Sequence, residues 1–373
     1  MANKIRVGLV FGGKSGEHEV SLASAHSVLS ALDKDKYEPV LIGVTKEGRW
    51  LMEGNPLKQL MSLTRSPLLK AENIADGTRN GTSKETISRS VSAISADRVL
   101  DSSVDVVFPL IHGPYGEDGT VQGLFELANI PYVGAGVAAS AVGMDKALMK
   151  AVFQAAGLPV AHFLVFLRVQ WEQEPEVTIQ KIEQAIGYPC FVKPANLGSS
   201  VGVTKAHNWD ELTQALTTAA QFDRKIIVEK GIIGREVECS VLGNDEPVAS
   251  IPGEIVPGHE FYDYDAKYAD ESGTRLLIPA ELSPEQVRTV QDLAIRAFKV
   301  IDCAGMARVD FFIQSSDGQV IVNEINTIPG FTSVSMYPKL WEASGLAYPR
   351  LIERLIELAL ERHQDKNRNP ISR

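Results

Sequence analysis

Two short stretches near the end of the chain constrain its fold most. Arg308-Val309-Asp310 and Glu324-Ile325-Asn326 both alternate polar with apolar residues, the period of a strand with one buried face. Between them, Ser316-Asp317-Gly318 suits a three-residue hairpin loop with glycine in the left-handed position. Pairing Ser315 with Gln319 then sets Asp310 opposite Glu324 and Arg308 opposite Asn326, all on one sheet face.

Two carboxylates, an amide and a guanidinium on one sheet face are costly unless a cation and an anion bind there. Mg²⁺ carrying nucleotide phosphates meets both demands, because Mg²⁺ takes one or two carboxylates together with phosphate oxygens. The alternative is a solvated sheet face with a chance Arg–Asp pair, since a one-residue change in register would scatter the group. The hairpin alone leaves both interpretations open.

Composition excludes several classes of protein. The chain has 373 residues and is 44% hydrophobic, enough for two or three domains with real cores, and its net charge of -10 argues against a nucleic-acid partner. Cys190, Cys239 and Cys303 are far apart and odd in number, so we expect neither a disulfide framework nor a zinc knuckle. No apolar run reaches membrane-spanning length, and the first strand is too short for a signal peptide. We therefore expect a cytoplasmic protein with no membrane partner.

The first third of the chain, residues 1–139, alternates strand-like and helix-like segments. The predicted strands are Ile5–Phe11, Pro39–Val44 and Val104–Ile111, and the predicted helices are Val20–Leu32 and Val121–Ala128. This order is typical of a doubly wound, Rossmann-like α/β domain. Residues 53–103 are rich in Ser, Asn and Thr and indicate an insertion of loops and small elements.

The pattern changes after residue 139. Short strands separated by glycine turns predict a small α+β domain over residues 140–235. Its expected helices are Lys146–Ala156 and one near Asp210–Ala220, and its expected strands are Cys190–Lys193, Ser200–Lys205 and Lys225–Glu229.

The remainder, residues 236–373, is predicted to be a third domain that contains the hairpin. It begins with a strand over Glu236–Leu242, followed by a polar loop from Gly258 to Gly273. A long helix opens with the capping box Ser283-Pro284-Glu285-Gln286, and an amphipathic helix over Tyr348–Glu361 closes the domain.

Gly8 to Ser15 matches the P-loop pattern G-x-x-x-x-G-K-[ST] letter for letter. In a P-loop the intervening residues form the phosphate cradle, whereas Leu9-Val10-Phe11 here are the strand itself, so we expect no P-loop. Glu17 follows this strand, close to a helix start. It is either a favourable charge near the helix dipole or a ligand-binding carboxylate at the edge where α/β sheets bind ligands.

Three further segments suit a nucleotide. Lys193 precedes a loop over 194–202 in which Ser199, Ser200 and glycines can offer hydroxyl and N–H groups to phosphates; the alternative is an ordinary Gly-rich hairpin. Lys146, alone, is typical of a surface lysine. The segment from Glu229 to Glu236 joins two domains, and such a hinge suits adenine and ribose.

Two loops complete the set of candidates. The stretch from Phe261 to Tyr268 contains three tyrosines and a phenylalanine and is typical of a lid rather than of a disordered loop. His112 ends the third strand of the first domain, where ligands bind, although a lone histidine is as often structural.

Taken in order, these segments closely resemble the D-alanine–D-alanine ligase family, ATP-grasp enzymes of peptidoglycan precursor synthesis. The resemblance spans nearly the whole chain apart from residues 53–103 and the tail. It is carried by Gly16-Glu-His-Glu-Val-Ser21, His112-Gly113 with Gly116-Glu-Asp-Gly119, Met144-Asp-Lys146, Phe191-Val-Lys193-Pro194 with Gly198-Ser-Ser-Val-Gly202, Tyr264-Asp-Ala-Lys-Tyr268, Arg308-Val-Asp310 and Glu324-Ile-Asn-Thr-Ile-Pro-Gly-Phe-Thr-Ser333.

The resemblance implies a three-domain ATP-grasp fold and a set of nucleotide and metal contacts. ATP would bind with two Mg²⁺ ions, for which Mn²⁺ could substitute, held by Asp310, Glu324 and Asn326. Phosphates would meet Lys146, Lys193, Ser199 and Ser200; adenine and ribose would meet Glu229 and Glu236; and Lys267 would approach the nucleotide with the lid.

The resemblance also implies the substrate contacts and the reaction. Glu17 would orient the ammonium group of the first D-alanine, Arg308 would face its carboxylate, and Ser335 with Gly330 and neighbouring backbone would receive the second D-alanine; His112 would border the substrates. Glu17, Ser199, Arg308 and Tyr268 would form the catalytic group. A tyrosine at position 268 goes with a D-alanine acceptor, while D-lactate-using relatives tend to differ there. The alternatives are a D-alanine–D-lactate ligase or another ATP-grasp carboxylate–amine ligase, and a homodimer is implied.

Overall fold

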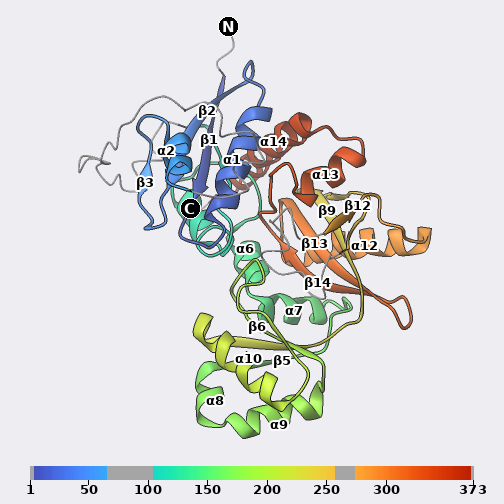
Figure 1. Ribbon diagram of the computed structural model, residues 1–373. Helices are drawn as coiled ribbons and strands as arrows, with labels where there is room; N and C mark the ends of the chain where they lie inside the picture. The colour runs from blue at the N-terminus through green and yellow to red at the C-terminus, as the bar shows by residue number, and fades with distance from the viewer. Residues whose placement is uncertain (1–3, 65–103, 257–273, 371–373) are drawn as a thin grey trace.

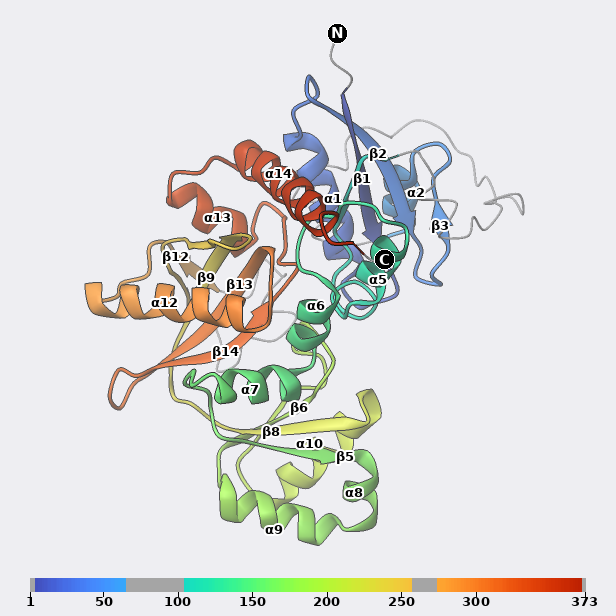
Figure 2. The ribbon, with the colours of Figure 1, turned by 180° about the vertical axis from the view of Figure 1, so that it is seen from behind.

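A computed structural model describes residues 4–64, 104–256 and 274–370 (Figures 1 and 2). Its strands form three separate sheets, and each sheet uses strands from one stretch of the chain. The two sheets built from the ends of the chain lie beside each other, and the middle one lies at the far end of the molecule in both views. None of the helices in the described part of the chain is both long and apolar enough to cross a membrane.

The first sheet has the order β3-β2-β1-β4, from Trp50–Leu51, Tyr37–Val44, Ile5–Gly12 and Val106–Pro109. β1 pairs in parallel with β2 and β4, as the apolar runs predict. Helices α1 (His18–Ala31), α2 (Pro56–Ser62) and α5 (Thr120–Leu127) accompany it. Gly8 to Phe11 lie inside β1, which confirms that the P-loop pattern is accidental.

The second sheet is antiparallel, with the order β5-β8-β6-β7, from Phe163–Leu167, Lys225–Lys230, Cys190–Pro194 and Thr204–Ala206. Helices α8 (Arg168–Gln173), α9 (Pro175–Ala185) and α10 (Trp209–Phe222) pack on it around a hydrophobic core of its own. Helices α6 (Val137–Met144) and α7 (Lys146–Ala155) connect the first sheet to this unit (Figure 1).

The third sheet has the order β12-β11-β9-β13-β14, with β10 (Val248–Ala249) paired to β9. Its strands are Arg275–Leu277, Gly253–Val256, Gly234–Gly243, Gly305–Gln314 and Val320–Asn326. Helix α12 (Pro284–Val300) begins at the predicted Ser283 capping box and packs against this sheet. Helices α13 (Met336–Ala343) and α14 (Tyr348–Lys366) follow.

The predicted register of the hairpin is correct at its polar end and wrong at its turn. Asp310 pairs with Glu324 and Arg308 with Asn326, as expected. Near the turn, however, Gln314 and not Ser315 bonds to Gln319, with Gln314 N to Gln319 O at 2.9 Å. A bulge at Asp310/Phe311 reconciles the two, because Phe311 pairs with Val322 and leaves one extra residue on β14.

The predicted strand over Ser200–Lys205 is also wrong in its first half. Only Thr204–Ala206 forms β7, and Ser199 and Ser200 have φ angles of 50° and 59°. These left-handed values are strained for residues other than glycine and are incompatible with a strand.

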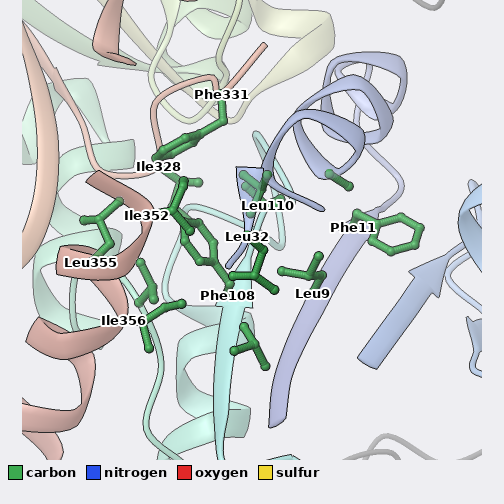
Figure 3. Close-up of a cluster of buried hydrophobic side chains, with 14 of the residues drawn as sticks. Leu9, Phe11, Leu32, Phe108, Leu110, Ile328, Phe331, Ile352, Leu355 and Ile356 are labelled. Carbon is green, nitrogen blue, oxygen red and sulfur yellow. The ribbon is translucent and has the colours of Figure 1, made fainter. Parts of the chain in front are cut away.

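One hydrophobic core is shared by the first sheet and the C-terminal helices (Figure 3). Phe108 from β4 meets Phe331 from the loop after β14 edge-on, with ring centroids 5.6 Å apart. Fully burying each such side chain contributes about 1.5–3 kcal/mol. The loop that follows the hairpin is therefore anchored in the N-terminal core. The same cluster includes Leu9, Leu110, Ile328, Ile352, Leu355 and Ile356.

Candidate active site

The polar face of the β13–β14 hairpin has the composition that the sequence predicts. Asp310 accepts two hydrogen bonds from Arg308, from Nε to Oδ1 and from Nη2 to Oδ2, both at 2.7 Å. Asn326 Nδ2 donates to the same Oδ2 at 3.0 Å. Arg308 is largely buried, and although burial lowers its pKa, Asp310 and Glu238 outweigh burial and raise the pKa well above its ordinary value.

Glu238 is a member of this face that the sequence analysis missed. It lies on β9 directly opposite Asp310, is 6% exposed, and its Oε2 is 3.0 Å from Arg308 Nε. The alternation Glu236-Val237-Glu238 within a predicted strand was the available signal, because it sets both carboxylates on one face. Arg308 is thus held between two carboxylates, that of Asp310 on its own strand and that of Glu238 on β9.

The donor chemistry of this face suits Mg²⁺. Asp310, Glu324 and Asn326 offer carboxylate and amide oxygens, the hard ligands that Mg²⁺ prefers. Across the described ranges, the structure gathers no three His, Cys, Asp or Glu side chains around one metal position. A site with only two carboxylates fits an ion that completes its coordination with substrate phosphates and water.

A cavity of about 540 Å³ opens beside this face, between the second and third sheets. Its volume is within the range of small-ligand sites. Eight residues that the sequence analysis proposed line it: Lys146, Lys193, Ser199, Ser200, Glu229, Glu236, Asp310 and Glu324. The fold therefore brings the predicted phosphate, hinge and metal residues together.

Both lysines predicted to meet phosphates contact acidic or carbonyl groups in the cavity wall. Lys146, at the start of α7, donates to Leu197 O at 2.8 Å and lies 3.5 Å from Glu324 Oε2. Lys193 Nζ donates to Glu229 Oε2 at 2.9 Å. Burial lowers the pKa of Lys193, but Glu229 and Glu324 outweigh burial, so its pKa is raised and it stays a cation.

Lys150 is a second residue that the sequence analysis missed. It lies one turn after Lys146 on α7 and is fully buried. Its Nζ donates to Asn323 O at 2.9 Å and is 3.4 Å from Glu229 Oε1. The four-residue spacing from Lys146 was the available signal, because it places both lysines on one helix face.

Glu17 and Ser199 meet, although 182 positions separate them. Glu17 directly precedes α1, and Ser199 Oγ donates a hydrogen bond to its Oε1. Two glycines make room for this contact, since a Cβ on Gly113 or on Gly198 would lie 2.9 Å from Glu17 Oε2. Through this hydrogen bond, the loop that contains the left-handed Ser199 contacts the unit built on the first sheet.

Glu117 is a third missed residue, within the Gly116–Gly119 motif. Its Oε2 accepts from Gly113 N at 2.7 Å and its Oε1 accepts from Ile328 N at 3.3 Å. Burial, and then the nearby Glu17 carboxylate, raise the pKa of Glu117 to about 8. It ties the His112 loop to the loop that follows β14.

His112 is buried, and both of its ring nitrogens contact protein groups. Nδ1 is 3.1 Å from Ile328 O and Nε2 is 3.3 Å from Ser24 Oγ. Burial lowers the pKa of His112, which favours the neutral ring with Nδ1 donating to the carbonyl. In this structure His112 connects β4 to the loop after β14.

Gly330 and Ser335 lie side by side in that loop. Ser335 precedes α13, and its Oγ accepts from Thr332 N at 3.0 Å. A Cβ on Gly330 would lie 2.6 Å from Ser335 Oγ, so a side chain there would displace this hydroxyl. Lys267 and Tyr268 are outside the described residues.

Comparison with known proteins agrees with this arrangement. A family model described as D-ala D-ala ligase N-terminus matches residues 6–135, and one described as D-ala D-ala ligase C-terminus matches residues 152–357. A D-alanine--D-alanine ligase from Heliobacterium modesticaldum is 52% identical over 99% of this chain and 98% of its own length.

Solved structures give the same result. The D-alanine-D-alanine ligase from Coxiella burnetii is 38% identical with a TM-score of 0.78, covering 98% of this chain and 97% of that one. The VanG D-Ala:D-Ser ligase from Enterococcus faecalis is 35% identical with a TM-score of 0.77, covering 96% of this chain and all of that one. The fold is therefore ATP-grasp, and the chain belongs to the D-alanine–D-alanine ligase family.

Proposed function

We propose that this protein joins two D-alanine molecules into D-alanyl-D-alanine at the expense of ATP, releasing ADP and phosphate, as a step of peptidoglycan precursor synthesis. One observation carries the proposal. A single region holds an oxygen-rich metal face with a buried guanidinium, a lysine-lined cavity of about 540 Å³, and the Glu17–Ser199 contact. The 52% identity to a protein named D-alanine--D-alanine ligase supports the choice of substrate.

The first step brings two anions together, because the carboxylate of the first D-alanine attacks the γ-phosphorus of ATP. Lys146, Lys193 and Arg308 offset that repulsion. Asp310, Glu324 and Asn326 would hold two Mg²⁺ ions, which supply further positive charge when bound. Arg308, held between Asp310 and Glu238, would turn its remaining N–H groups to the substrate carboxylate.

The second step is attack by the amine of the second D-alanine on the acyl carbon of D-alanyl phosphate, with phosphate as the leaving group. The amine attacks only when neutral. Glu17, fixed by Ser199, would orient the first D-alanine through its ammonium group, while Ser335 and the backbone at Gly330 would receive the second. Lys267 and Tyr268 would exclude water as part of a closing lid, since water destroys an acyl phosphate.

The acceptor is the point on which relatives differ. The similarity to a D-Ala:D-Ser ligase shows that this fold also serves another acceptor, and D-lactate is the third candidate. We assign D-alanine because the relative from Heliobacterium modesticaldum, named D-alanine--D-alanine ligase, is 52% identical, against 35% for the D-Ala:D-Ser ligase.

Phosphate release from ATP with purified protein tests the proposal. D-alanine alone should support turnover, whereas L-alanine or D-lactate alone should not. Product analysis from an equimolar mixture of D-alanine, D-serine and D-lactate then fixes the acceptor. Release that does not depend on D-alanine would overturn the proposed function. We further propose that the protein is cytoplasmic and forms a homodimer. Sedimentation at micromolar concentration would check the dimer.

A further inference from the structure

Lys150 has no place in the chemistry above, yet it is among the most buried side chains of the protein, at 1% exposure. It is absent from the lining of the nucleotide cavity, whereas its two partners, Glu229 and Asn323, both line it. A buried ammonium group is costly unless it is paired. Lys150 therefore supports the cavity wall from behind.

The two carboxylate oxygens of Glu229 have different surroundings. Its Oε2 accepts from Lys193, but its Oε1 is buried and accepts no hydrogen bond from any described residue. Lys150 Nζ lies 3.4 Å from this Oε1 as an ion pair without hydrogen-bond geometry. The carboxylate is thus held by charge on both sides, by Lys193 in the cavity lining and by Lys150 behind it.

The charges of Lys150 and Lys193 together act on the protonation of Glu229. Burial raises the pKa of Glu229, but Lys150 and Lys193 outweigh burial, so the pKa is lowered and the group is a carboxylate. An ionised carboxylate accepts hydrogen bonds and donates none. Beside a purine base it would accept from the 6-amino group of adenine and repel the 6-carbonyl oxygen of hypoxanthine or guanine.

We infer that Lys150 is a positioning residue that selects adenine nucleotides, by holding Glu229 from behind the cavity wall as an ionised carboxylate. The inference rests on the proposed function and on the placement of adenine beside Glu229 that the family resemblance implies. Lys150 also contacts the metal end of the cavity, through Asn323. Its hydrogen bond to Asn323 O fixes the extra residue of the β14 bulge, directly before Glu324, so one side chain sets both the base end and the metal end of the cavity.

Equilibrium binding of ADP and IDP, measured by calorimetry in the presence of Mg²⁺, tests the inference without catalysis. Wild type should prefer ADP. Lys150→Met should lower the ADP/IDP affinity ratio at least tenfold, because a Glu229 that has lost one cation gains a proton and can donate to the 6-carbonyl group. Lys150→Gln keeps a donor for Asn323 O without the charge, and should have the same effect if Lys150→Met fails to fold. Lys150→Arg should keep most of the preference.

Lys225→Met is the matched control, because Lys225 also pairs with a carboxylate between β8 and α7, that of Asp145. This variant should lose stability and keep the wild-type ratio. Glu229→Gln tests the placement of adenine separately from the role of Lys150. If it changes the ratio while both Lys150 variants do not, the inference about Lys150 is overturned and the base placement stands. If Glu229→Gln leaves the ratio unchanged, the placement of adenine fails, and the inference fails with it.

Discussion

Replacing Asp310 with asparagine separates the metal-binding part of this residue from its part in the fold. In the structure, both oxygens of Asp310 accept from Arg308, and hydrogen bonds to charged groups contribute about 1.5–3 kcal/mol each. Losing a buried ion pair outright costs about 3–5 kcal/mol. Arg308 keeps Glu238 at 3.0 Å, however, so we expect Asp310→Asn to lower the free energy of unfolding by only about 1–3 kcal/mol. A domain with about 5–15 kcal/mol of stability stays folded at 25 °C after such a loss.

Metal binding should suffer more. Removing groups that only support a metal ligand reduces affinity by about 10- to 100-fold, and a carboxylate ligand itself should cost at least about 100-fold. Free Mn²⁺ measured by electron paramagnetic resonance, in titrations with saturating ADP, reports this affinity without turnover, and thermal unfolding reports the fold. The matched control is Glu238→Gln, which disturbs Arg308 from its other side and leaves Asp310 in place.

Two results would refute the reasoning. Wild-type Mn²⁺ affinity in Asp310→Asn would remove Asp310 from the metal site. An equal loss of Mn²⁺ affinity in Glu238→Gln would show that the effect acts through the orientation of Arg308 and not through a lost ligand.

Three further variants test other parts of the site. Ser199→Ala removes a charge-assisted hydrogen bond to Glu17, so the KM for the first D-alanine should rise about tenfold or more; an unchanged KM in initial-rate measurements would contradict this. Glu117 has a folded-state pKa of about 8, above its ordinary 4.5, so folding favours the protonated form and its contribution to stability, full below pH 4.5, is lost as the pH rises toward 8. The melting temperature of Glu117→Gln should therefore fall less than that of wild type between pH 5 and 8, and parallel curves would disprove the assignment. Lys14→Ala should keep wild-type ADP affinity, because Lys14 lies over the Tyr115 ring, 5.3 Å from its centroid, and follows a strand; a loss of binding would restore the P-loop interpretation.

Local patterns predict much of this site but not its close approaches. The pairing of Asp310 with Glu324 follows from strand alternation, yet the bulge beneath it is not predicted, although the adjacent polar residues Asn323-Glu324 break the alternation there. The left-handed backbone of Ser199 is not predicted either, and the Glu17 carboxylate that its hydroxyl contacts lies 182 positions away. Such positions depend on residues far away in the chain.

Other omissions had a readable signal. Helix α9 is not among the predicted elements, although Pro175 stands at its first turn and Ile179 and Ile182 share its buried face. For Lys150 and Glu238, the spacing in the sequence indicates which helix or strand face they share with Lys146 and Glu236, but not that they are buried. Their importance comes from burial, which only the packed structure reveals.

The core in Figure 3 determines which parts of the chain can be expressed as separate fragments. The two matched family regions suggest a cut near residue 140, and residues 6–135 resemble a self-sufficient unit. Yet Phe331 and the α14 side chains Ile352, Leu355 and Ile356 fill the same interior as Phe108. An N-terminal fragment expressed alone would therefore present this apolar face to water and should aggregate. By contrast the middle unit, whose core is entirely its own, is the natural candidate for transplantation into a chimaera.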